Sequence, residues 1–224
     1  SINYLSGTMI PVNDAVENVE VRGFVFSNIG ESEGVYSPGD TATLFLGKVN
    51  GCVVEDCVFR RWWGAAISIA FLNGGKLVSS AEHVLISNCI FEAGSPYKEG
   101  NCINLISGKH IRICNCDFDG VNTTGEAGSN WPGPIDIEKE NASCVFDHVI
   151  IECCHFSNCD SLAAVNIACN QDTPLSPTYW SNVEDGVIMI KDIIIDGCCQ
   201  AVSVTNGCPC KSVVVDNITV NNIS

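Results

Sequence analysis

A short apolar sequence recurs along this chain, and its irregular spacing restricts the fold more than any other feature. Each copy follows the pattern x-V-x-I-x-N-C-x-F, in which apolar residues alternate with polar ones. Seven copies occur, at residues 18–26, 51–59, 83–91, 110–118, 148–156, 192–200 and 212–220. Successive copies begin 33, 32, 27, 38, 44 and 20 residues apart. Helical solenoids keep a constant repeat length, whereas stacked strands joined by variable loops need not, so the spacing predicts a parallel β-helix.

A bend and a second strand are expected after the first strand of each repeat. Residues that tolerate a left-handed backbone dominate the sixth repeat position, which reads Gly23, Asp56, Asn88, Asn115, Cys153, Gly197 and Asn217. Second strands are predicted at 43–47, 66–70, 102–106, 134–138, 164–168 and 201–205. Their inward positions are apolar, and the position between them reads Phe45, Ser68, Asn104, Asp136, Asn166 and Ser203. One face of this sheet should therefore carry a polar row with a spacing of about 4.8 Å.

The repeat predicts an all-β protein, a parallel β-helix of about seven coils with variable corner loops. The coils follow one another without a low-complexity linker, so residues 1–224 are expected to form a single β-helix domain. No apolar run is long enough to span a membrane, and we expect no signal peptide because the first residues lack a basic and apolar pattern. Neither end offers a cap, so we expect a fragment of a longer chain, or a solenoid whose ends partner subunits cover.

The charge of the chain restricts its expected partners, and its cysteines restrict the expected compartment and metal content. The 11 basic and 26 acidic residues give a net charge of −15, which argues against nucleic acid as a partner. Of the 15 cysteines, Cys57, Cys89, Cys116, Cys154 and Cys198 share the seventh repeat position, which predicts an internal ladder of free thiols. The odd cysteine count favours folding in a reducing cytosol. Close cysteine pairs lack zinc-knuckle spacing, so neither a metal site nor a cofactor is expected.

The stacked strands with asparagine at the bend resemble the right-handed parallel β-helix of the pectate-lyase-like superfamily, over about residues 16–220. The stretch W-P-G-P-I-D-I-E at 131–138, followed by Asn141 and Ala142, is similar to the G-I-D-I-E-P-x-N-A stretch of bacterial and bacteriophage β-helix proteins, including tailspike-type polysaccharide depolymerases. Pro134 and Lys139 depart from that pattern. Polygalacturonase motifs (N-T-D, D-D, G-H-G, R-I-K) and pectate-lyase motifs are missing. The resemblance implies a right-handed β-helix with a polysaccharide partner; the tailspike likeness further implies a homotrimer in a phage virion.

Two carboxylates on one predicted strand are the candidate catalytic residues. Asp136 and Glu138 are two residues apart, so they share a face with Cα atoms about 6.8 Å apart. Such a pair can supply the acid and the base or nucleophile of a glycosidase, of either stereochemistry. A solvated row of structural carboxylates is the alternative. Asn104 and Asn166 should flank Asp136 on adjacent coils, where they either contact sugar hydroxyls and orient the carboxylate or form a structural asparagine ladder.

Aromatic residues of the corner loops are the candidate substrate-binding residues. The segments 60–65, 92–101 and 119–133 should bring Trp62, Trp63, Tyr97 and Trp131 to one edge of the polar row. Aromatic rings beside hydroxyl-binding groups suit a sugar groove, although rings that fold back over the sheet would explain Trp62 and Trp63 equally well.

Two functions remain open at this level. The first is a tailspike-like depolymerase, with hydrolysis favoured over a lyase reaction, for which Lys139 is the nearest candidate base. The second is a noncatalytic structural or carbohydrate-binding β-helix of a virion or surface fibre. His83, His110 and His148 share the first repeat position, which predicts a stacked structural row instead of a catalytic group.

Overall fold

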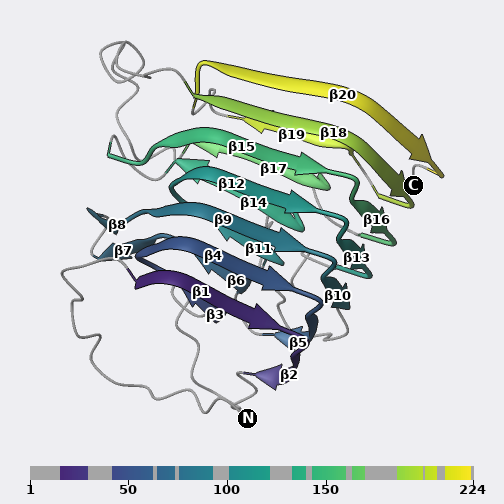
Figure 1. The fold of residues 1–224 in the computed structure, drawn as a ribbon. Coiled ribbons are helices and arrows are strands. Elements are labelled where there is room, and N and C mark those ends of the chain that lie inside the picture. Colours follow the sequence, from purple (N-terminus) through teal and green to yellow (C-terminus); the bar gives the residue numbers. More distant parts are fainter. Residues whose placement is uncertain are drawn as a thin grey trace.

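The computed structural model is a stack of β-strands in which each coil lies on the preceding one (Figure 1). It describes residues 16–29, 42–62, 65–73, 76–92, 101–121, 133–139, 143–159, 163–169, 186–198, 200–205 and 210–222. These ranges contain strands and turns and no helix, and hence no helix able to cross a bilayer. All strand pairs but one are parallel. The predicted all-β parallel β-helix is confirmed.

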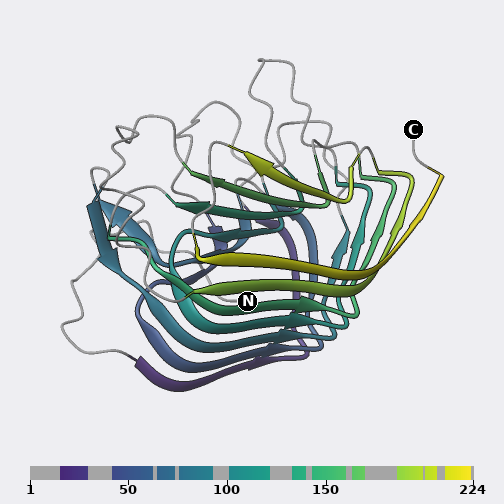
Figure 2. The ribbon, with the colours of Figure 1, turned by 90° about the horizontal axis from the view of Figure 1, so that it is seen from above.

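The larger sheet has 12 strands and forms two walls that meet at a corner, which is visible when the molecule is seen from above (Figure 2). The first wall contains β1 (Val16–Arg22), β4 (Val49–Glu55), β9 (Ala81–Ser87), β12 (Gly108–Cys114) and β15 (Phe146–Glu152). The second contains β2 (Val25–Ile29), β5 (Val58–Trp62), β10 (Ile90–Glu92), β13 (Asp117–Asp119) and β16 (His155–Ser157). The long strands β18 (Val187–Asp196) and β20 (Ser212–Asn221) belong to both walls. We call this sheet A.

Residues with a left-handed backbone form the corner between the two walls. The φ angles lie between 48° and 69° at Gly23, Asp56, Asn88, Asn115, Cys153, Asp192 and Asn217. The bend predicted from the sixth repeat position is therefore present in each coil. In the sixth coil, however, the residue at this bend is Asp192 and not Gly197.

The sixth copy of the repeat lies five residues earlier than predicted. Val149 pairs with Ile188 and Phe156 with Ile195, so the sixth copy is 187–195 and not 192–200. The seventh copy is correct, since Val187 pairs with Ser212. Gly197 and Cys198 match the bend residue and the cysteine of the repeat pattern, which places the predicted copy too late in the sequence. The actual bend residue, Asp192, is followed by isoleucine in place of cysteine.

Gly197 belongs to a second row of left-handed residues at the far end of the second wall. Gly120, Asn158, Gly197 and Asn222 have φ angles of 67°, 53°, 74° and 48°. Backbone hydrogen bonds from Gly120 to Ser157 and from Asn158 to Asp196 join successive coils there. Cys198 consequently lies beside Cys159 and outside the ladder in which it was expected, because Ser157 and Asp196 are in register and each cysteine follows two residues later.

The smaller sheet, sheet B, has six parallel strands in the order β19-β17-β14-β11-β6-β3. Its strands are β3 (Ala42–Leu46), β6 (Ala65–Ile69), β11 (Ile103–Leu105), β14 (Ile135–Lys139), β17 (Val165–Cys169) and β19 (Val202–Thr205). These bounds agree with the predicted second strands to within one residue. One feature was not predicted: β7 (Phe71–Asn73) and β8 (Lys76–Ser79) form an antiparallel pair.

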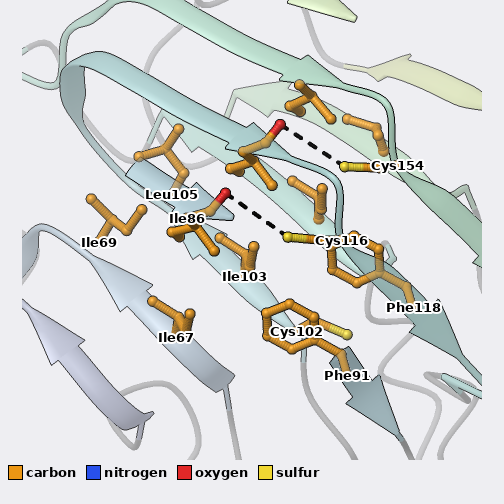
Figure 3. Close-up of a cluster of buried hydrophobic side chains, with 14 of the residues drawn as sticks. Ile67, Ile69, Ile86, Phe91, Cys102, Ile103, Leu105, Cys116, Phe118 and Cys154 are labelled. Carbon is orange, nitrogen blue, oxygen red and sulfur yellow. Dashed lines mark hydrogen bonds between the residues drawn. The ribbon is translucent and has the colours of Figure 1, made fainter. Parts of the chain in front are cut away.

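The core lies between the sheets and consists of like side chains stacked coil on coil (Figure 3). Five phenylalanines stack with ring centroids 4.6 to 5.0 Å apart, namely Phe26, Phe59, Phe91, Phe118 and Phe156. Ile67, Ile69, Ile103 and Leu105 of sheet B are fully buried, as predicted for inward positions. Val204, also expected inside, is 51% exposed on β19, the last strand of sheet B.

Four buried cysteines form the predicted thiol ladder: Cys57, Cys89, Cys116 and Cys154. Each thiol donates to the carbonyl two residues earlier at 3.3 Å. The thiols of Cys116 and Cys154 also lie 3.9 Å from carbonyls of the preceding coil, Ile86 and Ile113 (Figure 3). Contacts with the thiols of Cys154 and Cys89, together with burial, raise the pKa of Cys116, which keeps it protonated. The four cysteines of the ladder are free thiols.

Candidate functional site

The predicted polar row is present on sheet B, in the expected register. Asn104 of β11 pairs with Ser68 on one side and with Asp136 on the other. Asn166 of β17 pairs with Asp136 and with Ser203. Because Ile135 and Ile137 point into the core, the side chain of Asp136 points to the outer face of the sheet.

Most of this row is enclosed and not solvated. Asp136 and Asn166 are each 2% exposed, Ser68 is 7% exposed and Ser203 is 8% exposed. Asn104 is half-buried. Enclosure of Asp136 was not expected, because alternation along a strand indicates only the face of the sheet on which a side chain lies.

Two asparagine amides donate to the carboxylate of Asp136, one to each oxygen. Asn166 Nδ2 lies 2.9 Å from Oδ1, and Asn101 Nδ2 lies 3.2 Å from Oδ2. An ionised carboxylate accepts hydrogen bonds and donates none, so each amide must turn its nitrogen toward Asp136 and its oxygen away. Asp136 therefore fixes the orientation of both amides.

The two amide oxygens that point away receive no hydrogen bond from the described part of the chain. Asn101 Oδ1 and Asn166 Oδ1 are buried and without a partner, although both residues are only 2% exposed. A buried polar atom without a partner costs about 1–3 kcal/mol in stability. Such atoms are uncommon in native proteins and require an explanation, such as a ligand that supplies the missing donors.

Asn101 was missed by sequence analysis, whereas Asn104 flanks Asp136 in register, as expected. The amide that reaches Asp136 from the coil of β11 belongs to Asn101, which precedes this strand, and not to Asn104 within it. Asn101 is anchored locally, since its carbonyl accepts a hydrogen bond from the backbone N–H of Ala66. Asn101 lies outside the strand alternation, so the repeat gave no signal for it.

Glu138 lies on the same face of β14 as Asp136, two residues further along the strand. It is half-buried and pairs in register with Ala168 of β17. Thus Glu138 is more accessible than Asp136. The two carboxylates share a strand and a face but differ in enclosure, a difference that can set different protonation behaviour in one site.

Trp62 does not lie in a corner loop, contrary to the prediction from the sequence. It ends strand β5, is 3% exposed and meets Phe91 edge-on with ring centroids 6.4 Å apart. Trp62 is therefore a core residue and has no free face for a sugar ring. The other predicted aromatic residues, Trp63, Tyr97 and Trp131, lie outside the described residues.

Comparisons with known proteins assign no family to this chain. No protein-family model matches this sequence, and no curated protein matches it. A solved structure that is similar in part is the surface protein and adhesin PfbA of Streptococcus pneumoniae, with 12% sequence identity and a TM-score of 0.39. The match covers 93% of this chain and 65% of that one, so this chain spans just under two thirds of the length of PfbA.

Proposed function

We propose that this protein is a noncatalytic, carbohydrate-binding β-helix that contacts a polysaccharide through the outer face of sheet B. The observation that carries the proposal is the pair of buried amide oxygens on Asn101 and Asn166. Hydroxyl groups are the donors that these oxygens lack, and polysaccharides present hydroxyls along their whole length.

The enclosure of Asp136 favours binding over catalysis. Both of its oxygens already accept hydrogen bonds from amides, and the side chain is 2% exposed. A general base or nucleophile must offer a lone pair to its target, and on Asp136 the two amide donors compete for both oxygens, whereas the amide oxygens of Asn101 and Asn166 have no such competing donor among the described residues. Asp136 acts instead as the group that orients the two amides toward a ligand.

Cleavage of the bound polysaccharide is the second candidate function. It is favoured by Glu138, a half-buried carboxylate two residues from Asp136 on the same face. In that case Glu138 would supply the acid and Asp136 the base or nucleophile, as in a tailspike-like hydrolase of the pectate-lyase-like superfamily. A trimeric assembly in a virion would accompany this alternative.

A panel of bacterial polysaccharides tests the binding proposal. Replacing Asp136 with Asn (D136N) keeps the shape of the side chain but removes the charge that orients both amides. We expect D136N to weaken polysaccharide binding by at least about tenfold, equivalent to about 1.4 kcal/mol. The matched control is D192N. Asp192 also accepts a hydrogen bond from an asparagine amide, that of Asn217, but it is an exposed residue of sheet A. Equal binding by D136N and D192N would contradict the proposal.

Activity assays on the same panel distinguish the two functions. Reducing-end release reports hydrolysis, and unsaturated uronate formation reports a lyase reaction. Binding without either product supports the noncatalytic function. Product release that is lost in an E138Q variant, with binding retained, supports cleavage and rejects the noncatalytic proposal.

A further inference from the structure

Three histidines stack along sheet A at the first position of consecutive repeats. The ring centroids of His83 and His110 are 4.8 Å apart, and those of His110 and His148 are 5.1 Å apart. The planes are nearly parallel, with angles of 10° and 25°. All three residues are exposed. The predicted stacked row is therefore present, with its ring edges accessible to solvent.

Backbone geometry alone does not explain why histidine occupies this position. The φ angles of His83, His110 and His148 are 54°, 54° and 51°, in the left-handed region. In the two preceding coils the same position holds Asn18 and Gly51, with φ angles of 54° and 77°. Asparagine and glycine adopt this conformation readily, so the fold requires the backbone and not the imidazole.

Asp147 adds a carboxylate beside the last histidine. Its Oδ1 lies 2.7 Å from Nδ1 of His148. This oxygen is buried and accepts no well-aligned hydrogen bond from the described residues, and its contact with the ring nitrogen is an ion pair only when His148 is protonated. A buried carboxylate oxygen in contact with an imidazole nitrogen, and without a well-aligned hydrogen bond, is suited to a shared cation.

We propose that His110, Asp147 and His148 bind a divalent transition-metal ion, with Zn²⁺ as the best fit. The ligand atoms of the three residues all lie within 4.8 Å of one another. Two imidazoles and one carboxylate are a donor set that suits zinc, with a water molecule as fourth ligand. Imidazole nitrogen disfavours Ca²⁺ and Mg²⁺, which take oxygen ligands.

A small movement of exposed side chains completes the site. Zinc–ligand distances are about 2.0–2.2 Å, so donor atoms that share one ion must approach to within about 3.5 Å of each other. His110 is exposed, and the side chain of His148 is 61% exposed, which leaves both rings free to rotate. Lys109 lies in register with Asp147, and its positive charge should keep the affinity moderate.

His83 supplies a matched control on the same ladder. Its Nδ1 lies 2.9 Å from Oδ1 of Asn50, so this ring has a protein partner of its own. It stacks on His110 but is not among the three residues whose ligand atoms converge. An H83N variant therefore shortens the histidine row without changing the proposed ligands.

Calorimetric titration with ZnCl₂ tests the site. Asparagine is accommodated at this repeat position in Asn18, so H110N and H148N should fold, which thermal unfolding checks. We expect one Zn²⁺ per chain, at least about tenfold weaker binding in H110N and H148N, and less than a twofold change in H83N. Because the exposed thiol of Cys153 also can bind zinc, a C153S variant must retain the wild-type affinity.

Imidazole ¹⁵N resonances of the wild-type protein provide a second readout that needs no variant at the site. Zn²⁺ should shift the ring nitrogens of His110 and His148 and leave those of His83 and His155 unchanged. The proposal is overturned by the absence of binding at millimolar ZnCl₂, by unchanged affinity in both H110N and H148N, or by binding that disappears in C153S.

Discussion

Glu152 is a carboxylate held between cations of the two adjacent coils. Its side chain is 9% exposed, with Lys191 Nζ 3.0 Å from one oxygen and Arg112 Nε 2.6 Å from the other. The hydrogen bond from Lys191, supported by that from Arg112, holds the pKa of Glu152 below its usual value against the opposing effect of burial. The ionised form therefore stabilises the folded chain.

Replacing Glu152 with Gln should make the free energy of unfolding depend less on pH in the acidic range. The folded pKa lies below the unfolded value of about 4.3, so the contribution is present above that pH and is lost as the pH falls through the folded pKa. We expect E152Q to lower the free energy of unfolding by roughly 1 kcal/mol at pH 7, because both cations are partly exposed. Urea denaturation at neutral pH and at a series of acidic pH values measures this difference.

The control for this prediction is E20Q, since Glu20 pairs with Arg22 while its side chain is 64% exposed. This variant should change stability little at any pH. A loss in E152Q that is equally large below the folded pKa of Glu152 would show that the ion pairs are not its cause.

At the scale of elements, the alternation of apolar and polar residues predicted where the strands of sheet B lie. It did not predict that the outer face of this sheet is largely buried. Ile135 and Ile137 lie inside because every second residue of β14 must face the core. The burial of Asp136 depends on segments distant in sequence, and its partner Asn101 lies outside the strand. Trp62 is not the loop residue that the repeat predicts, because the strand β5 extends beyond the repeat pattern. Periodicity reports which face a residue occupies, and tertiary contacts decide what covers it.

Gly133, which precedes strand β14, lies too close to the next coil to tolerate a side chain. A Cβ there would lie 1.9 Å from the carbonyl oxygen of Ala163, which belongs to the next coil. Steric overlap with backbone should force β14 and β17 apart and disturb the hydrogen bond between Asp136 and Asn166. We expect G133A to lower stability by about 1–3 kcal/mol and to weaken polysaccharide binding.

The matched control is G120A, because a methyl group added at Gly120 would meet no atom within 4 Å, while the backbone there has a φ of +67°. Its cost should be confined to the left-handed backbone, about 1–2 kcal/mol, with binding retained. Thermal unfolding and binding assays on both variants measure the difference. Retained binding in G133A would argue that the start of β14 does not position the site.

At the scale of the whole molecule, the described strands of sheets A and B pair only with strands of adjoining coils. In the described part of sheet A, β1 pairs only with β4 and β20 pairs only with β18. Most residues of these two strands are exposed, including Val16 and Val215 at 48% each. Stability in such a stack is a sum of coil and interface terms, so it should be lowest in the outermost coils.

Hydrogen exchange measured by mass spectrometry tests this expectation. Peptides from β9, β12 and β15 should exchange at least about tenfold more slowly than peptides from β1 and β20, because the first three strands are paired on both sides, whereas β1 and β20 are paired on one side among the described residues. Rates are compared after correction for the intrinsic exchange of each sequence. Uniform protection from end to end would indicate a single cooperative unit.

The connectors between the second wall and sheet B differ in length, and this affects which changes of sequence the fold tolerates. Two residues separate β5 from β6, ten separate β10 from β11, fifteen separate β13 from β14, and seven separate β16 from β17. Nevertheless, Phe59, Phe91, Phe118 and Phe156 remain in register, as do Ser68, Asn104, Asp136 and Asn166. Connector length is thus uncoupled from coil stacking. Segments exchanged between coils, or grafted from elsewhere, can alter what the molecule presents to a partner while the ladders that hold it together stay unchanged.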